Sequence, residues 1–558
     1  MANIYDKVPV KVQRRSGFDK SFQNLFSSKV GTITPILTDE LIPNSTVNLK
    51  IAMTTQLPPL ASDTFMRVKQ KYAAFFVPTR LLVGHYEKWL TNQKVGVSST
   101  SDASINPVLP TYRWTVDSDY ACVKPGTLAD YLGYKVSDGH TTDLANFQGV
   151  TEVSALPFLA YHRIYNDWFR NSLVQKDIYL DVTSNSPCAS CSPRVCWTNE
   201  SNSLYMALNS GGTFSNTTVN AAHQDWFADG VHLWELRQAN FGSDMFTSCS
   251  PTAQNGDAQS VSINEDTTSF TISALRAANS MQQFLERNNL CGNRMVDFVK
   301  AQYGANLNDA IAQRAILLGS GSFDVYSKGI YQTSNAQTGD ANLNNPMANT
   351  VGAKYGSAYV DGNDFVIKGF TAQEPGYLMV VTWLSPKVTY STGINPMLTR
   401  YVGTNKQSDM ANPILQNVGN EPLYAKYIDG NKALEGGTDT TVFGYNDRYC
   451  TWKDCIDEVH GILRDGSSLQ SFALQRTFDD ATAAAPEISS DFLKIPTDYL
   501  NQVSSVSEDV SSYGYWTDCY FDYKVVMPLA KYSIPSLENP SAEHGDDVMI
   551  NKGGTSLS

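Results

Sequence analysis

The sequence at residues 47–53 reads Val47-Asn48-Leu49-Lys50-Ile51-Ala52-Met53, so apolar residues alternate with polar or small ones. Successive side chains of a β-strand point to opposite faces, which places Val47, Leu49, Ile51 and Met53 on one face. We therefore predict a strand that buries this face in a core and ends at Pro58 and Pro59.

Three further segments have the length and composition of strands. Residues 65–78 alternate at first, with Arg67, Lys69 and Lys71 on one face, and finish in a wholly apolar run before Pro78. Residues 377–384 are a continuous apolar run, and residues 521–527 alternate before Pro528. Alternation is typical of a strand with one wet face, whereas a continuous apolar run is typical of a strand buried on both faces.

Two segments have the period of a helix. Phe158, Tyr161, Tyr165 and Trp168 lie three or four residues apart after Pro157, which predicts a short amphipathic helix over 156–172. Residues 273–289 predict a second helix, with Ser273 as N-cap and Gly292 just past its end. Its apolar stripe consists of Ala274, Ala278, Met281 and Leu285.

Long stretches rich in Ser, Thr, Asn and Gly separate these segments, at 97–120, 182–225, 250–270, 332–364 and 402–440. Ordinary connections have a median of about 4–6 residues. Either several domains alternate with linkers, or one β-core carries large excursions. We favour the second, because the strands are scattered from residue 47 to residue 527 with no α/β block between them. We expect an internal arm over 1–40, one domain over 41–535 with an outward excursion at 182–245, and a tail over 536–558.

The chain has 558 residues, of which 42% are hydrophobic and 17% are charged. This is the composition of a globular protein whose hydrophobic core is large enough to be stable without disulfides or bound metals. The 29 Tyr, 24 Phe and 9 Trp suit extensive interfaces. No signal peptide or membrane-spanning run is evident, so we expect a soluble chain made in the cytoplasm. The nine cysteines are irregularly spaced and indicate reduced thiols.

The net charge of −13 excludes a protein that binds nucleic acid through the charge of its whole surface. The N-terminal 29 residues, however, carry six basic and only two acidic residues. We see neither helical nor strand periodicity there and interpret it as a basic arm. The candidate contacts to nucleic-acid phosphates are Lys7, Lys11, Arg14, Arg15 and Lys20. Tyr5, Phe18 and Phe22 could stack on unpaired bases. The alternative is that Arg14 and Arg15 pair with carboxylates of a neighbouring subunit.

Aromatic side chains within the loop-rich stretch 182–245 are candidates for binding at the surface. We single out Trp197, Trp226, Phe227 and Trp234 as candidate receptor contacts, because exposed aromatic residues on loops are candidates for binding. An inward-packed loop core is the alternative for each of them.

The usual catalytic and cofactor motifs are absent, so we expect no enzyme and no cofactor. Asp457-Glu458-Val459-His460 only approaches a zinc-protease motif, and Gly319-Ser320-Gly321-Ser322 lacks the rest of a phosphate loop and is interpreted as a turn. Cys188 and Cys191, with Cys196 and the distant His223, provide half of a zinc knuckle or simply free thiols. A pair of catalytic carboxylates cannot be assigned from sequence.

Several blocks, in order along the chain, resemble the major coat protein of the Microviridae, especially its gokushovirus-like branch. They are Arg15-Ser16-Gly17-Phe18-Asp19, Leu41-Ile42-Pro43, Phe75-Phe76-Val77-Pro78-Thr79-Arg80-Leu81-Leu82, Leu128-Ala129-Asp130-Tyr131, Ala155-Leu156-Pro157-Phe158, Asn166-Asp167-Trp168-Phe169-Arg170, Phe246-Thr247-Ser248-Cys249, Leu285-Glu286-Arg287, Val442-Phe443-Gly444-Tyr445, Met527-Pro528 and Tyr532-Ser533-Ile534-Pro535. Only about twenty residues separate Cys249 from the second predicted helix, where that branch usually carries a long insertion.

The resemblance implies an all-β fold, an eight-stranded antiparallel jelly roll with long inter-strand loops and a few short helices. The strands at 47–53 and 521–527 would lie side by side. It further implies a homo-oligomer of pentamers in a small icosahedral capsid around circular single-stranded DNA, and hence a virion protein. The implied partners are a small basic DNA-packaging protein, an internal scaffolding protein, a minor DNA pilot protein and a host cell-surface receptor.

Two other functions remain as alternatives. A secreted carbohydrate-binding or carbohydrate-cleaving β-protein would share the jelly roll and the aromatic loops. A non-enzymatic adhesin or receptor-binding spike would share the composition but would not explain the basic arm. Particle size after expression distinguishes them, because a coat protein gives pentamers or shells.

Overall fold

The computed structural model describes residues 15–62, 64–82, 86, 90, 109, 111–112, 125–134, 153–176, 178, 231, 233–256, 271–291, 294–329, 354–360, 365–400, 419–431, 441–478, 485–504 and 514–529. Its strands are β1 Ser16–Asp19, β2 Phe22–Ser28, β3 Thr34–Leu41, β4 Thr46–Leu60, β5 Val68–Pro78, β6 Thr111–Tyr112, β7 Val153–Ser154, β8 Ile316–Gly329, β9 Lys354–Val360, β10 Phe365–Thr371, β11 Gly376–Pro386, β12 Asn420–Tyr424, β13 Val442–Asp447 and β14 Tyr515–Met527. Its α-helices are α2 Leu128–Tyr131, α3 Leu156–Ile164, α4 Ile272–Cys291, α5 Met295–Tyr303, α6 Pro396–Thr399, α9 Cys450–Lys453 and α10 Ser490–Leu493.

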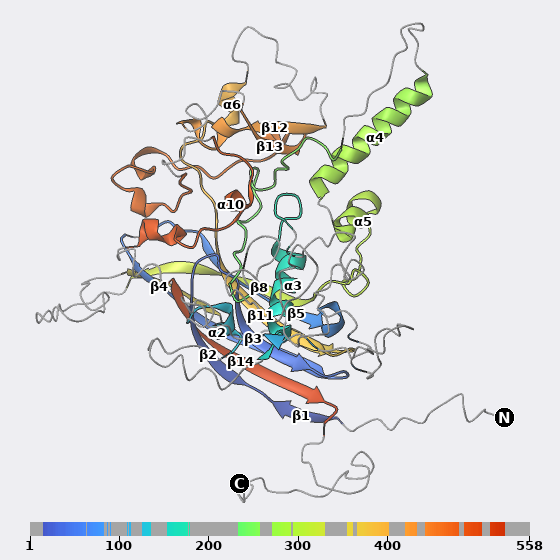
Figure 1. Cartoon of the computed structure of the whole chain (residues 1–558). Helices are drawn as coiled ribbons and strands as arrows, with labels where there is room; N and C mark the ends of the chain where they lie inside the picture. Colours follow the sequence, from blue (N-terminus) through green and yellow to red (C-terminus); the bar gives the residue numbers. More distant parts are fainter. Residues whose placement is uncertain are drawn as a thin grey trace, which may run out of the picture.

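Most strands form two antiparallel arrangements that enclose a common core (Figure 1). In one, β14 lies between β2 and β4, and β10 pairs with the far side of β4. In the other, β11 lies between β3 and β5, and β8 pairs with the far side of β5. Pairing of β8 with β9 joins the two arrangements, and β1 adds to β14. This strand order is that of a jelly roll.

Strands far apart in the sequence are therefore neighbours. Ile51 of β4 lies opposite Phe521 of β14, which confirms the predicted pairing of segments 47–53 and 521–527. Residues 79–315 intervene between the paired strands β5 and β8. The all-β jelly-roll class is confirmed, although the linked sheet of the described residues has ten strands instead of the eight expected.

The core between the two arrangements is apolar with a polar centre. Alternate residues of β4 and β14 point into it and meet Ala74 and Phe76 of β5 and Leu378 and Val380 of β11. The polar side chains at this centre form hydrogen bonds with one another, as buried polar groups usually do. Thr55 Oγ1 lies 2.9 Å from Thr517 Oγ1, Thr55 donates to Gln70, and Gln70 Nε2 donates to Thr382 Oγ1 at 3.3 Å.

A second core covers the opposite face of β5 and β11. Ala73, Phe75 and Val77 of β5 and Met379 and Val381 of β11 belong to it. Both strands are thus buried on both faces, which is why residues 377–384 lack a polar alternation. The strand predictions at 65–78 and 377–384 are confirmed by β5 and β11.

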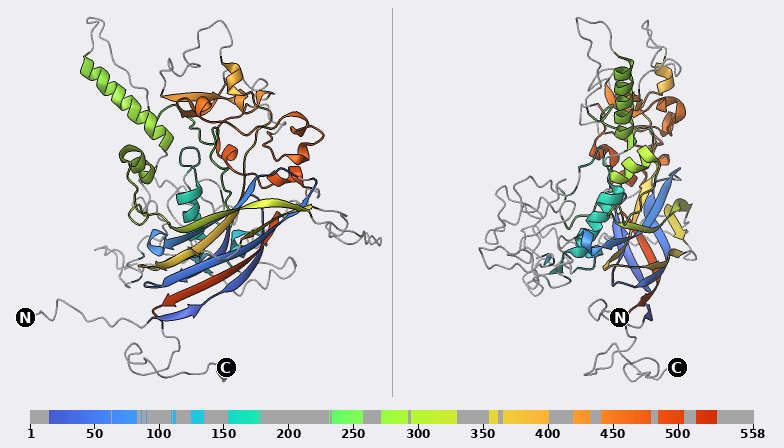
Figure 2. Two further views of the ribbon diagram at one scale, coloured as in Figure 1. Left: turned by 180° about the vertical axis from the view of Figure 1, so that it is seen from behind. Right: turned by 90° about the vertical axis from the view of Figure 1, so that its right-hand side faces the viewer.

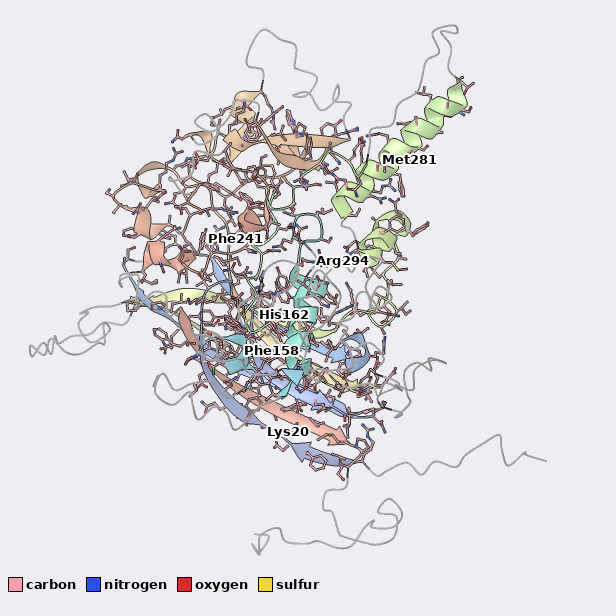
Figure 3. The ribbon with its side chains drawn as sticks, in the orientation of Figure 1. Lys20, Phe158, His162, Phe241, Met281 and Arg294 are labelled. Atoms are coloured by element: carbon pink, nitrogen blue, oxygen red, sulfur yellow. The ribbon has the colours of Figure 1, made fainter. Side chains whose placement is uncertain are left out.

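Helix α3 packs on this second core, and Figure 3 shows His162 and Phe158 on it above the strands. The predicted helix over 156–172 is confirmed for 156–164, after which Tyr165–Phe169 forms a π-helical turn. Its predicted amphipathic character is wrong. His162 and Arg163 are 1% and 4% exposed, because loop residues cover the polar side of the helix as well.

Helices α4, α5, α6 and α10 and the β12–β13 pair lie above the strands, and α4 projects at one edge (Figures 1 and 2). The predicted helix over 273–289 is confirmed as α4. The predicted N-cap is wrong by two residues, because the Thr271 hydroxyl accepts from the Ala274 amide at 3.3 Å. Met281, a member of the predicted apolar stripe, is 48% exposed.

Three local predictions are wrong. The predicted arm, residues 1–40, includes β1, β2 and most of β3, although we see neither helical nor strand periodicity in its first 29 residues. Pro58 and Pro59 do not end β4, which continues to Leu60 past a register shift between Gln56 and Pro59 that accommodates the missing donors. Residues 319–322 lie within the strand β8 and form no turn.

The glycines of β8 reflect close approach instead of a turn. A Cβ on Gly319 would lie 2.1 Å from the carbonyl oxygen of Val366, and one on Gly321 would lie 2.3 Å from the Tyr72 hydroxyl. Glycine inside a strand is a mark of such contact with another chain segment.

Candidate functional site

Five basic residues of the N-terminal arm are candidate contacts to nucleic-acid phosphates, and two of them lie in the described region. Arg15 Nη2 donates to the Thr46 hydroxyl at the start of β4. Lys20, between β1 and β2, forms an ion pair with Asp39 of β3 (Figure 3). Lys7, Lys11 and Arg14 lie outside the described residues. Both described residues thus help to fix the first strands to the sheet.

Lys20 belongs to a small charged cluster at the lower edge of the sheet. Its Nζ lies 5.5 Å from the centre of the Tyr523 ring, and the Tyr523 hydroxyl donates to Asp39 Oδ2 at 2.7 Å. Burial, together with the Asp39 carboxylate, raises the pKa of Tyr523. The phenol therefore stays protonated and shares Asp39 with Lys20, which remains 38% exposed at its side chain.

The outward face of this sheet carries exposed aromatic and basic side chains. Tyr520 of β14 is 52% exposed and Leu25 of β2 is 71% exposed. Lys50 Nζ lies 4.5 Å above the centre of the Phe365 ring, and Lys524 pairs with Asp522 at 3.0 Å. Interleaved aromatic and cationic groups can contact unpaired bases and phosphates together.

Of the four candidate receptor contacts, only Trp234 is described. It is partly buried against the second core, and its carbonyl accepts from the Leu128 amide at 2.9 Å. Its neighbours Leu233 and Arg237 are 0% and 3% exposed. The outward excursion predicted over 182–245 therefore does not include 233–245, because this segment packs inside the protein. Trp197, Trp226 and Phe227 lie outside the described residues, as do Cys188, Cys191, Cys196 and His223.

A basic cavity of about 390 Å³ lies at one end of β5, β8 and β11. Arg67, Lys69, Lys71 and Lys387 line it, and sequence reasoning had placed the first three on one face without assigning them a role. Asp457 Oδ2 pairs with Lys387 and lies 3.7 Å from Arg67. Burial and the nearby Lys69 lower the pKa of Lys71. The excess of positive charge favours an anionic group at this position.

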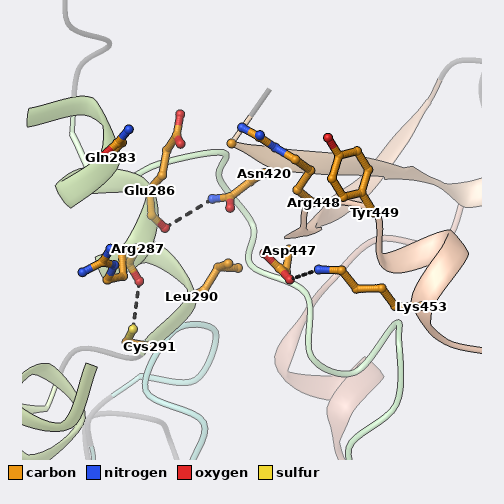
Figure 4. A pocket seen from close by; sticks show the side chains of 11 residues that line it. Gln283, Glu286, Arg287, Leu290, Cys291, Asn420, Asp447, Arg448, Tyr449 and Lys453 are labelled. Carbon is orange, nitrogen blue, oxygen red and sulfur yellow. Dashed lines mark hydrogen bonds and ion pairs between the residues drawn. The ribbon is translucent and has the colours of Figure 1, made fainter. Parts of the chain in front are cut away.

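A second cavity, of about 560 Å³, separates the C-terminal half of α4 from the segments around β12 and β13 (Figure 4). Its charged groups have partners within the chain: Asp447 pairs with Lys453, and Arg287 Nη1 donates to Gln302 Oε1 at 3.5 Å. Asn420 Nδ2 donates to the Glu286 carbonyl at 3.4 Å. The cavity is therefore a polar seam that ties α4 to the body.

Two polar side chains, one buried and one partly buried, anchor the α4–α5 pair. Asn289 of α4, 1% exposed, accepts at Oδ1 from Ser250 Oγ at 3.0 Å and from Thr252 Oγ1 at 3.2 Å. Arg294, just before α5, donates to the carbonyls of Asn166, Asp167 and Arg170 at 2.6, 2.9 and 2.7 Å. These carbonyls lie toward the C-terminal end of the π-helical turn, so Arg294 serves as its cap.

The buried titratable groups described next have a structural role: they are uncharged and are packed or hydrogen-bonded inside the protein. His162 accepts at Nδ1 from Arg237 Nε at 3.0 Å, and burial together with Arg237 lowers the pKa of His162. Burial raises the pKa of the Cys249 and Cys519 thiols, which are therefore protonated and poor nucleophiles. No group of three or more His, Cys, Asp and Glu in the described ranges could hold a metal ion.

Comparison with known proteins is consistent with this arrangement of a jelly roll and large insertions. A family model described as "Capsid protein (F protein)" matches residues 6–537. The chain is 26% identical to the capsid protein VP1 of Bdellovibrio phage phiMH2K, over 95% of this chain and 97% of the relative. It is 23% identical to the VP1 of Chlamydia phage 1, over 96% and 98%, and 26% identical to that of Spiroplasma virus 4, over 91% and 92%.

The match extends from the arm through both sheets and all insertions, and so it covers every element described above. The relatives are structural proteins of virions, and the sequence resemblance to the Microviridae is confirmed. In the described residues no helix is long and apolar enough to cross a membrane. The chain therefore belongs to the phage capsid protein (F protein) family and is a major capsid protein of the Microviridae, a component of the virion.

Proposed function

We propose that this capsid protein assembles through pentamers into a small icosahedral shell that encloses circular single-stranded DNA and contributes to host attachment. One observation carries the proposal: the inter-sheet core is complete within a single chain, whereas large apolar side chains on the insertions stay exposed. Ile311 is 70% exposed and Leu398 of α6 is 65% exposed. Exposed apolar groups of this size mark sites of association.

The proposed assembly is tested on the full chain produced in a bacterium that also supplies the other phage proteins. We expect sedimentation to resolve a pentamer or a closed particle, and electron microscopy to show isometric shells of one size. A chain that remains monomeric under these conditions at micromolar concentration would contradict the proposal.

The DNA contact is proposed for the arm and for the sheet face from which it leaves. The first described residues, Arg15 and β1, lie beside β14. The outward face of that sheet carries Tyr520 and the Lys50–Phe365 pair described above. Lys7, Lys11, Arg14, Arg15 and Lys20 would neutralise phosphates, with Lys20 doing so only in competition with Asp39. The ion pairing of Arg14 and Arg15 with a neighbouring subunit remains the alternative.

Replacing Lys11, Arg14 and Arg15 together by alanine is expected to lower the DNA content of assembled particles. Each phosphate contact to a single strand contributes a salt-dependence slope of about 0.7, so three lost contacts lower the slope by about 2. The DNA content is measured by absorbance of purified particles after washes of rising salt concentration.

The matched control replaces Lys176, Arg464 and Lys494, basic residues outside the arm that are at least partly exposed. It removes the same charge and should leave the DNA content unchanged. Normal shells of the arm variant with undiminished, equally salt-resistant DNA would contradict the phosphate contact. Failure of the arm variant to assemble would favour pairing between subunits.

Host attachment and the further partners rest on the family resemblance. We propose that Trp197, Trp226 and Phe227 contact a cell-surface receptor, with Trp234 contributing only its partly exposed edge. A small basic DNA-packaging protein, an internal scaffolding protein and a minor DNA pilot protein are the proposed partners during assembly.

A further inference from the structure

Helix α4 presents an apolar stripe that its own chain covers only in part in the described region. Ala274, Ala278, Met281 and Leu285 recur at three- or four-residue intervals, the spacing of one helix face. Ala278 and Leu285 are partly buried, whereas Ala274 is exposed and Met281 is 48% exposed. Three further apolar residues of the helix, Ile272, Leu275 and Phe284, are 68%, 47% and 40% exposed. Figure 3 shows Met281 on the part of α4 that projects from the body.

The two halves of α4 differ in support. The C-terminal half is fixed by the buried Asn289, by Asn420 and by a ring contact of 6.2 Å between Phe284 and Phe298 of α5. Residues 272–277 are all exposed. Isolated helices shorter than about 12–15 residues are marginal in water, because helical stability in proteins comes mostly from packing of the apolar face. The projecting half therefore requires a surface to pack against.

The composition of this half is that of an interface core. Residues 272–285 contain a single charged residue, Arg276. Depletion of charge together with exposed Met and Phe distinguishes the centres of protein interfaces from ordinary surface. A solvent-exposed helix would instead carry acidic and basic residues at most positions of its outer face.

We propose that the α4 stripe packs against a second copy of this chain, and that this contact is one of the subunit interfaces of the capsid. The inference rests on the proposed self-assembly and names a surface for it. A second copy is the occupant that the family membership supports, because a capsid protein meets many copies of itself. Every copy then buries an identical stripe, so one apolar helix face is used throughout the shell.

The area needed defines the extent of the contact. The projecting part, residues 272–285, is about 21 Å long and about 10 Å wide, so one face covers on the order of 200 Å². A standard interface buries about 800 Å² on each partner. The exposed residues Met295 and Tyr303 of the adjoining α5, at 69% and 75% exposure, supply further apolar area to the proposed contact.

The test compares Met281→Asp with Ser280→Asp. Both substitutions put the same charged residue at exposed, adjacent positions of α4, but Ser280 lies about 100° away around the helix axis, off the stripe. Burying an unpaired carboxylate in an apolar interface is strongly unfavourable. We expect Met281→Asp to reduce the yield of assembled particles at least tenfold, whereas Ser280→Asp assembles like the unmodified chain. The melting temperature of the dissociated chain should be equal in all three.

Particle yield is measured by sedimentation of the full chain, expressed with the other phage proteins. Met281→Asp particles at a yield within twofold of the unmodified chain would overturn the inference. A lower melting temperature of the dissociated Met281→Asp chain, without one for Ser280→Asp, would also overturn it, because the stripe would then be covered by its own chain. If the unmodified chain forms no assembly, the proposed function fails and this contact fails with it.

Discussion

Replacing Phe76 by alanine is expected to destabilise the jelly roll by about 3–5 kcal/mol, the usual cost of truncating a buried aromatic side chain. Phe76 is 1% exposed and lies in the core between the two strand arrangements. Its ring centre is 5.2 Å from that of Phe370 of β10, and its backbone lies opposite Leu378 of β11. Truncation leaves a cavity that strands held on both sides cannot close.

The measurement is hydrogen exchange of the β4, β5 and β11 amides in the dissociated chain, expressed as the free energy of opening. A local readout suits this chain, because a protein of this size does not unfold in a single two-state step. The control is Phe65→Ala, a residue that is 78% exposed just before β5, and it should change the opening free energy by less than about 0.5 kcal/mol. Equal effects of the two variants would contradict the inter-sheet core.

Replacing Gly319 by alanine is expected to lower the stability of the folded chain by about 1–3 kcal/mol, the usual cost of adding a group to a well-packed site. The added Cβ would lie 2.1 Å from the carbonyl oxygen of Val366 in β10. The obstacle is backbone, so relief requires movement of a whole strand and cannot come from rotation of a side chain. We expect slower particle assembly and a lower melting temperature of the dissociated chain.

Gly17→Ala is the matched control, because Gly17 also lies in a strand but a Cβ there would meet nothing within 4 Å. An alanine at an unstrained glycine position stabilises the folded protein by about 0.4–1 kcal/mol, because it lowers the conformational entropy of the unfolded chain. The two substitutions should therefore change the melting temperature in opposite directions. A Gly319→Ala chain as stable as the unmodified one would show that β8 and β10 do not approach closely.

The strands with a strong pattern were predictable, and those with a weak one were not. Residues 47–53, 65–78, 377–384 and 521–527 follow the two patterns of a half-buried and a fully buried strand. β2 was missed because it lies at the edge of its sheet and is mostly exposed, so no alternation of apolar residues is required of it. Its strand conformation comes from hydrogen bonds to β14.

The candidate surfaces were only partly predictable. The basic residues of the arm are evident from local charge, but the pairing of Lys20 with Asp39 depends on β3 folding back beside it. The basic cavity combines β5 with Lys387, more than three hundred residues later, and periodicity showed only its Arg67-Lys69-Lys71 part. The apolar stripe of α4 was evident from the sequence as a pattern, but its exposure was known only from the structure.

The sequence by itself determined the all-β class, the main strands, both helices and the family, because alternation, helical period and ordered blocks are properties of neighbouring residues. Tertiary structure decided which strands pair, why Gly319 and Gly321 are glycines, and which apolar faces stay uncovered. These depend on contacts between segments hundreds of residues apart, and a local pattern shows that a face is apolar without showing what covers it. For α4 the described part of the chain covers the apolar stripe only in part, and the remaining cover is assigned to another copy.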